Sequence, residues 1–350
     1  KVGPDGEWDW VVDAKDSASC CSSSQVEDVL ALDDGSAIFL IDAGYDMGFT
    51  NPVTGVAETF SAVGDTSIVA RIAADGTFMW FTELTGSPEH PFSLALSAGQ
   101  TSVVAVAAET TWDTSNIFVE GFNASTGASE WTDTISFADG GYRHTGYRPQ
   151  LAANDVGLAV VSFPYYNGSA VVNGVSYNSE DNNNQINGAE QTIFVAYDIS
   201  DPQTAGVEWV TRTRKSSTAN VLGSTEARAS ISRLAASGNN FLALMKVLGG
   251  NNGIPNRTVD FADASDTADL SYTTDANVSA DEDVGFVVVE LSSTGDWVEK
   301  TRVTYCANGP SGCGLSSVYD QTNLHVASDG SFDIFASTDG TGGSIAGMNL

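Results

Sequence analysis

Two short sequence signatures alternate along the chain, and this alternation constrains the fold more than any other feature. The first signature is an apolar run, a turn with glycine and then a tryptophan, as in 67–72, Gly76 and Trp80. The second is an apolar run, a turn with glycine and another apolar run, as in 29–40 around Gly35. Each signature occurs five times in strict alternation, which predicts a protein built by repeating one small unit. The turn glycines of the first signature are Gly6, Gly76, Gly127, Gly206 and Gly295, and those of the second are Gly35, Gly99, Gly157, Gly238 and Gly330.

Each signature has the pattern of a β-hairpin. Apolar residues alternate over short runs, and the glycine stands where a two-residue turn needs a positive φ. No longer segment carries the apolar stripe of a helix, so we expect an all-β fold. A unit then holds four strands: a tryptophan-bearing strand, a central strand, the strand after the glycine, and the next Ile-Phe-Val strand.

The spacing of the units favours a β-propeller. The first-signature glycines are 70, 51, 79 and 89 residues apart, and a four-stranded propeller blade needs about 40–50. We therefore predict one β-propeller domain of four-stranded antiparallel blades over 1–350, with polar insertions between strands. The five expected units are 7–76, 77–127, 128–206, 207–295 and 296–350, with segment 1–12 closing the ring. The alternative is that these repeats form part of a larger propeller or tandem array.

The signatures resemble a known repeat family. Pro4–Trp10 and 68–80 are similar to SBBP-type β-propeller repeats, which occur in tandem in secreted and surface proteins of bacteria and archaea. The resemblance covers essentially the whole chain, although most copies depart from the pattern. Trp297 is followed by Glu299 where a second tryptophan is expected, and Gly206 precedes Trp209 by one residue fewer than in other copies. The resemblance implies a propeller and no catalytic residue.

The repeated tryptophans are interpreted as anchors that pack one blade on the next, because a buried indole supplies a large apolar area. Trp112 lies outside the repeat register, and it is the tryptophan that a lectin-like, carbohydrate-binding propeller would expose. The predicted anchors are Trp10, Trp80, Trp131, Trp209 and Trp297.

Charge limits the partners. The chain carries 45 acidic and 14 basic residues, a net charge of −31, which disfavours nucleic acid and anionic membranes. No run approaches the roughly 18 uncharged apolar residues of a membrane span, so we expect no membrane insertion.

Several residues point to an extracellular or cell-surface location. Cys306 and Cys313 flank a turn-rich loop and are predicted to form a disulfide, whereas Cys20 and Cys21 pair with each other or elsewhere; four free thiols are the alternative. Four sequons are compatible with a glycoprotein. Their asparagines are Asn123, Asn167, Asn256 and Asn277.

Candidate chemistry is sparse. His90, His144 and His325 form no metal or catalytic motif, and His325 takes a central-strand position where a packed side chain is expected. No cofactor is required by the sequence. Asp281–Asp283 (Asp281, Glu282 and Asp283) could hold calcium, since hard cations take carboxylate oxygens; diffuse screening by counterions is the alternative.

These features favour a non-catalytic extracellular propeller, a structural or adhesive surface module able to serve as a filament or surface-layer subunit. Its expected partners are protein or glycan at a cell surface, or further copies of itself. Two alternatives stay open: a lectin-like carbohydrate-binding propeller, and a glycoside hydrolase with two acids in the propeller funnel.

Overall fold

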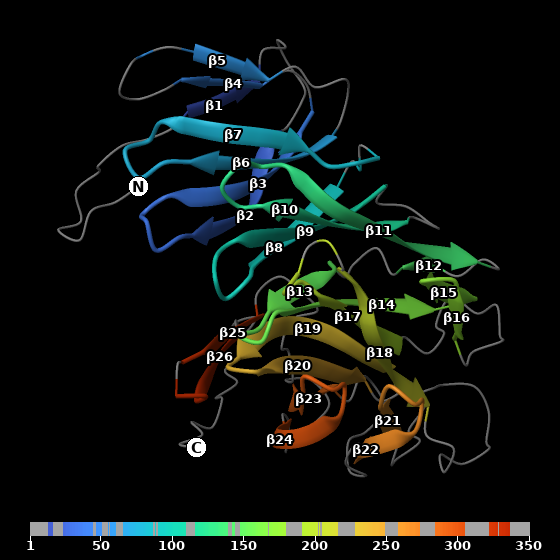
Figure 1. The fold of residues 1–350 in the computed structure, drawn as a ribbon. Helices are drawn as coiled ribbons and strands as arrows, with labels where there is room; N and C mark the ends of the chain where they lie inside the picture. Colours follow the sequence, from blue (N-terminus) through green and yellow to red (C-terminus); the bar gives the residue numbers. More distant parts are fainter. Residues whose placement is uncertain are drawn as a thin grey trace, which may run out of the picture. The chain divides into compact units, whose positions relative to one another are not determined.

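The fold is all-β in the part of the chain that the structure, a computed structural model, describes (Figure 1). The chain divides into two compact units, residues 1–135 with 201–205, and residues 136–200 with 206–350. The described residues are 13–16, 24–44, 47–50, 55, 57–60, 66–86, 88, 90–109, 116–138, 142–143, 148–166, 168–179, 191–201, 203, 205–215, 228–248, 258–273, 284–304, 322–327 and 329–336.

Four sheets share one strand order. Four antiparallel strands follow each other from one edge to the other in sequence order, with longer insertions between the second and third strands. Sheet 1 is β2 (Gln25–Ala31), β3 (Ala37–Ala43), β6 (Thr66–Ile72) and β7 (Phe78–Glu83). Sheet 2 is β8 (His90–Leu96), β9 (Ser102–Ala108), β10 (Ile117–Asn123) and β11 (Ser129–Ala138).

The remaining sheets continue the pattern. Sheet 3 is β13 (Gln150–Ala153), β14 (Leu158–Tyr166), β17 (Gln191–Asp198) and β18 (Gly206–Lys215). Sheet 4 is β19 (Arg228–Ser237), β20 (Asn240–Leu248), β23 (Val284–Leu291) and β24 (Trp297–Thr304). Sheet 5 is described as β25 (Thr322–Val326) paired with β26 (Phe332–Ala336).

The sheets begin and end one strand later than the expected units. The tryptophan-bearing strand pairs with the Ile-Phe-Val strand before it, as β7 does with β6 and β11 with β10, so it closes a sheet and does not open the next one. The reason is local. A tight turn, in which the Gly76 amide donates to the Ala73 carbonyl (2.9 Å), folds the two strands into a hairpin.

The repeated turns mostly have three residues and not the two expected. In sheet 1, the Leu32 amide donates to Ser36 O (2.9 Å) and the Gly35 amide to Leu32 O (3.0 Å), with Gly35 at φ 80°. This is a type I turn followed by a left-handed glycine. The Asp34 carboxylate accepts from the Ser36 amide and stiffens the turn. Gly238 opens the one two-residue repeat turn that the described strands show, between Ser237 and Asn240.

Consecutive sheets pack face to face within each unit. In unit 1, Leu40 and Val69 of sheet 1 share a core cluster with Val103 and Phe122 of sheet 2. In unit 2, sheet 3 packs on sheet 4 through a larger cluster, and sheet 4 packs on sheet 5 through a smaller one. The central strand β6 is buried along all seven residues, including the polar Thr66, Ser67 and Arg71.

Three hairpins are inserted between repeat strands; two of them extend a repeat sheet at its edge, and the third forms a separate three-stranded sheet with β1. Hairpin β15 (Ser169–Val172)–β16 (Val175–Asn178) pairs with the end of β11, and β21 (Thr258–Ala262)–β22 (Ala268–Thr273) pairs with the end of β18. Hairpin β4 (Met47–Thr50)–β5 (Ala57–Phe60) pairs with β1 (Asp13–Asp16). The short strand β12 (Tyr142–Arg143) pairs with β14.

Sheet 5 differs from sheet 1 near its turn. His325 lies opposite Asp333, two residues from the turn, where sheet 1 places Leu30 opposite Ile38. Both His325 and Asp333 are exposed, so the expected packing of His325 is wrong. A polar pair on this face has less apolar area to bury than the equivalent pair of sheet 1.

Candidate functional site

Many of the predicted site residues lie outside the described residues, so their predictions stay predictions. They are Cys20, Cys21, Cys306 and Cys313, the calcium candidates Asp281, Glu282 and Asp283, the sequon residues Asn167, Asn256 and Asn277, and Trp10, Trp112 and His144.

Trp80 joins sheet 1 to sheet 2. Its indole Nε1–H donates to the Ala124 carbonyl at 3.1 Å, and its six-membered ring lies over Gly127, in the turn between β10 and β11. A Cβ on Gly127 would lie 2.5 Å from Cε3 of Trp80. The neighbouring Thr82 hydroxyl donates to the Gly127 carbonyl at 2.6 Å. A tryptophan of one sheet therefore rests on the glycine turn of the next.

Trp209 makes the equivalent contact from sheet 3 to sheet 4. Its Nε1–H donates to the Ser293 carbonyl at 2.9 Å, and its ring lies against Gly295, whose Cβ would be 3.2 Å from Cδ2 of the indole. Gly295 has φ 88°. The same contact thus recurs in both units, between the fourth strand of one sheet and the last turn of the following sheet.

Trp131 and Trp297 behave differently. Trp131 lies over Gly121, its partner on β10 in the same sheet, where a Cβ would collide with the indole. Trp297 pairs with Leu291, as Phe78 pairs with Ile72, so it stands two positions before the register of Trp80. Its Nε1–H donates to Thr211 Oγ1 (2.9 Å) and Ala262 O (3.0 Å) inside the core of unit 2. The sequence signal for this difference was the spacing between the turn glycine and the tryptophan: Trp297 follows Gly295 by two positions, whereas Trp80 follows Gly76 by four.

Asn123 is the sequon residue that the structure describes, and its side chain builds a turn. Its Oδ1 accepts from the Ser125 amide (3.0 Å) and the Thr126 amide (3.1 Å). Its Nδ2, the atom that a glycan would modify, donates to Glu130 Oε1 at 3.1 Å. Glycosylation at Asn123 would therefore compete with the turn that carries Gly127.

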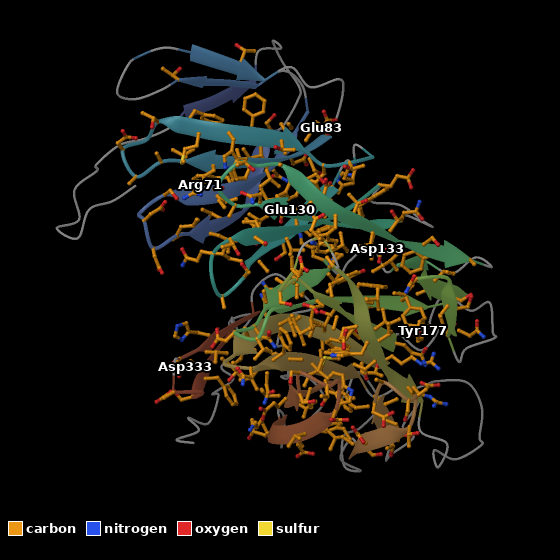
Figure 2. All side chains as sticks on the ribbon, viewed as in Figure 1. Arg71, Glu83, Glu130, Asp133, Tyr177 and Asp333 are labelled. Atoms are coloured by element: carbon orange, nitrogen blue, oxygen red, sulfur yellow. The ribbon has the colours of Figure 1, made fainter. Side chains whose placement is uncertain are left out.

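Arg71 is a buried cation on the sheet 1 face that meets sheet 2 (Figure 2). Its guanidinium donates to Ala124 O (2.7 Å), Ser36 Oγ (3.0 Å) and Asp34 Oδ2 (2.5 Å). The hydrogen bonds from the side chain and backbone of Ser36, together with Arg71, hold the pKa of Asp34 below its ordinary value. Arg71 thus ties the first and second sheets at the same carbonyl that Trp80 uses.

Glu120 is a buried carboxylate in the middle of β10. It accepts from the Thr85 amide (2.7 Å) and the Thr85 hydroxyl (2.9 Å), and from the Ser129 hydroxyl. Thr85 follows the last strand of sheet 1, so this carboxylate also holds a connection between sheets. A buried carboxylate that accepts from three donors has its hydrogen-bonding capacity used in contacts between elements.

Arg212 is the centre of a buried polar cluster in unit 2. Its Nε and Nη2 donate to the two carboxylate oxygens of Asp266, both at 3.0 Å, and Nη1 donates to the Tyr165 hydroxyl (3.2 Å) and Asn178 O (2.6 Å). Burial lowers the pKa of Arg212. The hydrogen bonds and charges of Asp266 and Tyr165 raise the pKa by a larger amount, so the net pKa lies above its ordinary value. This clamp fixes hairpins β15–β16 and β21–β22 to β14 and β18.

Gln191 lies on the same sheet face, opposite Tyr165. It is 2% exposed, and within the described part of the chain neither its Oε1 nor its Nε2 has a hydrogen-bond partner. Both atoms have less than 1 Å² of accessible surface. Tyr177 (Figure 2) stands near the same cluster, and burial raises its pKa.

Sequence reasoning missed Arg71, Glu120 and Arg212 as interface residues. The available signal was a charged side chain inside an otherwise apolar strand, as in 66–72 and 117–123. Such a residue is buried only when it is paired, so it marks a contact with another element. The signal does not identify that element.

In the described ranges, no set of three or more His, Cys, Asp and Glu side chains could hold a metal ion. The same ranges contain no helix long and apolar enough to cross a membrane.

Comparisons with known proteins do not identify a family. No protein-family model matches the chain, and no curated protein matches it. An uncharacterized protein, lmo1340, from Listeria monocytogenes EGD-e is a similar solved structure at 9% identity, covering 91% of this chain and 96% of that one, with a TM-score of 0.26. BamB from Moraxella catarrhalis has 11% identity, 90% and 99% coverage and a TM-score of 0.26. These scores are too low to assign a shared fold.

Proposed function

We propose that this chain is a β-propeller of four-stranded blades that acts outside the cell as a non-catalytic structural or adhesive module. The observation that carries the proposal is the repeated contact of a fourth-strand tryptophan with the last turn of the next sheet, seen at Trp80–Gly127 and Trp209–Gly295. Both contacts run from one sheet to the sheet that follows it in the sequence. Repetition of the same contact would join successive sheets into a stiff scaffold.

The polar groups support a scaffold. Arg71, Glu120 and Arg212 are each occupied by several hydrogen bonds to backbone or side chains of neighbouring elements. Hairpins β15–β16 and β21–β22 are added at sheet edges, and loops carried on a rigid framework are suited to recognition. The proposed partners are therefore proteins or glycans of a cell surface, or further copies of the chain.

Binding and assembly can be tested together. The purified chain, labelled with a fluorophore, is applied to a glycan array and to intact cells of the source organism, while negative-stain microscopy is used to look for filaments. We expect retention on cells or ordered assemblies. An acidic protein of similar charge serves as the control, because a net charge of −31 could bind cationic surfaces non-specifically.

Hydrolysis provides the opposing result. Release of reducing sugar from a panel of oligosaccharides, together with absence of cell binding and assembly, would contradict the proposal and favour the glycoside hydrolase alternative. Retention on glycans without hydrolysis would identify the adhesive partner as carbohydrate.

A further inference from the structure

Hairpin β15–β16 ends in a two-residue turn made by Asn173 and Gly174. Val172 and Val175 form the closing pair, and both turn residues have positive φ, 47° at Asn173 and 76° at Gly174. These values are typical of a type I′ turn, which favours asparagine followed by glycine. The same dipeptide closes a succinimide ring more readily than other asparagine pairs, because glycine has no side chain to shield its amide nitrogen.

The reacting groups at this turn are accessible. Asn173 and Gly174 are exposed, and a Cβ added to Gly174 would meet nothing within 4 Å. No hydrogen bond within the described ranges occupies the Gly174 amide or the Asn173 side chain. Water can therefore reach the amide nitrogen and remove its proton, which is the first requirement for attack on the side chain.

Two other turn asparagines are held by hydrogen bonds. Asn123 accepts from the Ser125 amide (3.0 Å) and donates to Glu130 Oε1 (3.1 Å). Asn154 accepts from the Leu158 amide (2.9 Å) and donates to a backbone carbonyl of the next sheet. Such bonds fix the side-chain amide in one orientation. The side chain of Asn173 lacks this restraint within the described part of the chain.

We propose that Asn173 is a site of spontaneous deamidation, and that one of its two products opens the tip of the hairpin. The Gly174 nitrogen attacks Cγ of Asn173, so that a new C–N bond forms and the bond from Cγ to Nδ2 breaks. The proton of the Gly174 amide passes through water to the leaving nitrogen, which departs as ammonia. This inference goes beyond the proposed function and does not depend on it.

Water then opens the succinimide ring. It adds to one of the two ring carbonyl carbons, and the bond from that carbon to the Gly174 nitrogen breaks. Attack at Cγ gives aspartate, whereas attack at the main-chain carbonyl gives isoaspartate, in which the chain continues through the side chain. Water is the one co-reactant, and nothing is oxidised or reduced.

Ring closure requires the tip to open briefly, because the closed turn holds Cγ of Asn173 away from the Gly174 nitrogen. The hairpin permits a local opening, since β15 pairs with β11 only as far as Val171. The root stays fixed by the Ser179 amide, which donates to Gly168 O (2.7 Å), and by Arg212 Nη1, which donates to Asn178 O (2.6 Å). Fraying of this kind is the lowest-energy opening of a hairpin.

The two products should affect the hairpin differently. Aspartate tolerates a positive φ and keeps a loop of two residues, so it adds a negative charge and preserves the turn. Isoaspartate places the side-chain methylene in the main chain. The longer loop no longer fits the turn that sets Val172 opposite Val175, so we expect this product to release the closing pair.

The test follows residue 173 in the intact chain at about pH 8 and 37 °C. Peptide mapping with fragment ions is used because the sequence holds four other Asn-Gly pairs. The same chain unfolded in urea gives the rate without the turn. We expect deamidation at residue 173 of the folded chain within about tenfold of the unfolded rate. A rate lower than this would overturn the inference, because it would show that the tip stays closed.

Hydrogen exchange of residues 169–178 tests the conformational step. In aged protein, the fraction of molecules that exchange rapidly should equal the isoaspartyl fraction at residue 173. Asn173→Asp carries the charge without the added methylene, and it should exchange within about twofold of the unaged parent. Aged Asn173→Gly keeps a type I′ turn and cannot deamidate at this position, so it should show the slow population alone.

Two results would contradict the conformational step. One is slow exchange in a sample that contains isoaspartate at residue 173, and the other is rapid exchange in Asn173→Asp or in aged Asn173→Gly. Neither measurement reports on cell binding or assembly. Failure of this inference and failure of the proposed function are therefore distinguishable.

Discussion

The indole of Trp80 lies directly on Gly127, which has φ 72° and no side chain to keep the ring away. Alanine at this position would be strained in the left-handed region and would place its Cβ 2.5 Å from Cε3 of Trp80. We expect Gly127→Ala to lower the free energy of unfolding by about 2–5 kcal/mol, the sum of the two effects.

Urea denaturation of Gly127→Ala and Gly174→Ala separates these causes. Gly174 has a similar φ of 76°, but a Cβ added there would meet nothing within 4 Å, so only the strain of about 1 kcal/mol applies. Equal losses in the two variants would show that the indole moves away at no cost.

Trp80→Ala should remove both the hydrogen bond to Ala124 and the apolar contact between sheets 1 and 2. We expect a loss of roughly 2–4 kcal/mol, below that of a fully buried tryptophan because Trp80 is half-buried. Met79→Ala is the control; Met79 is the neighbouring residue and is 49% exposed. A melting temperature of Trp80→Ala within a degree of the parent would dismiss Trp80 as an anchor.

Arg212→Lys should loosen the two inserted hairpins of unit 2. Lysine cannot reproduce the paired bonds to Asp266 together with those to Tyr165 and Asn178. We expect a loss of about 2–3 kcal/mol. Arg214→Lys, at a more exposed side chain that also contacts Asp266, should cost less than about 1 kcal/mol. Equal effects would mean that charge, and not the buried geometry, matters.

Gln191→Met should stabilise the chain. The substitution keeps the length of the side chain and removes two buried polar atoms that make no hydrogen bond within the described ranges, so we expect a gain of about 1–2 kcal/mol in chemical denaturation. Gln150→Met, at a side chain that donates to the Arg148 carbonyl, is the control and should not gain. Destabilisation by Gln191→Met would reveal that the amide has a bound partner such as water.

The turn aspartates predict a fall of stability in acid. The backbone hydrogen bond from Thr267, and then the side chain of Ser265, hold the pKa of Asp263 below its ordinary value. A carboxyl whose pKa is lower in the folded state stabilises the fold above the unfolded pKa of about 4, and this contribution disappears as the pH falls through the folded pKa. Asp75 and Asp329 have pKa values lowered by hydrogen bonds from Thr77 and Ser331.

The check is the urea midpoint between pH 5 and pH 2. Asp263→Asn keeps an oxygen acceptor for the turn and removes the titrating proton, so its midpoint should fall less steeply than that of the parent. Asp155→Asn, an exposed turn residue of sheet 3, is the control for loss of one charge. Identical slopes in all three proteins would contradict the assignment.

The strands were predictable because each hairpin is encoded locally. The alternation of short apolar runs with glycine turns predicted an all-β chain, and the left-handed φ values of Gly35, Gly76 and Gly157 agree with the turn chemistry. The grouping of strands into sheets was predicted one strand out of phase. The reason is that the sequence pattern marks both hairpin turns and sheet-to-sheet connections as polar segments with glycine.

The contacts between sheets were less predictable. Trp80 and Trp209 were recognised as repeated residues, but their acceptors, Ala124 O and Ser293 O, are backbone atoms that no side-chain pattern marks. Arg212 pairs with Asp266, which lies 54 positions later in the chain, in an insertion that carries neither repeat signature. Long-range pairs of this kind depend on the paths of the inserted hairpins, which one sequence does not specify.

The inserted hairpins are attached to sheet margins, and the tip of β15–β16 at Asn173 and Gly174 is exposed with open space around it. A foreign peptide spliced at this tip would therefore be displayed without disturbing the buried layers. The protein could then serve as a carrier for inserted epitopes, because added residues at Gly174 would meet open space.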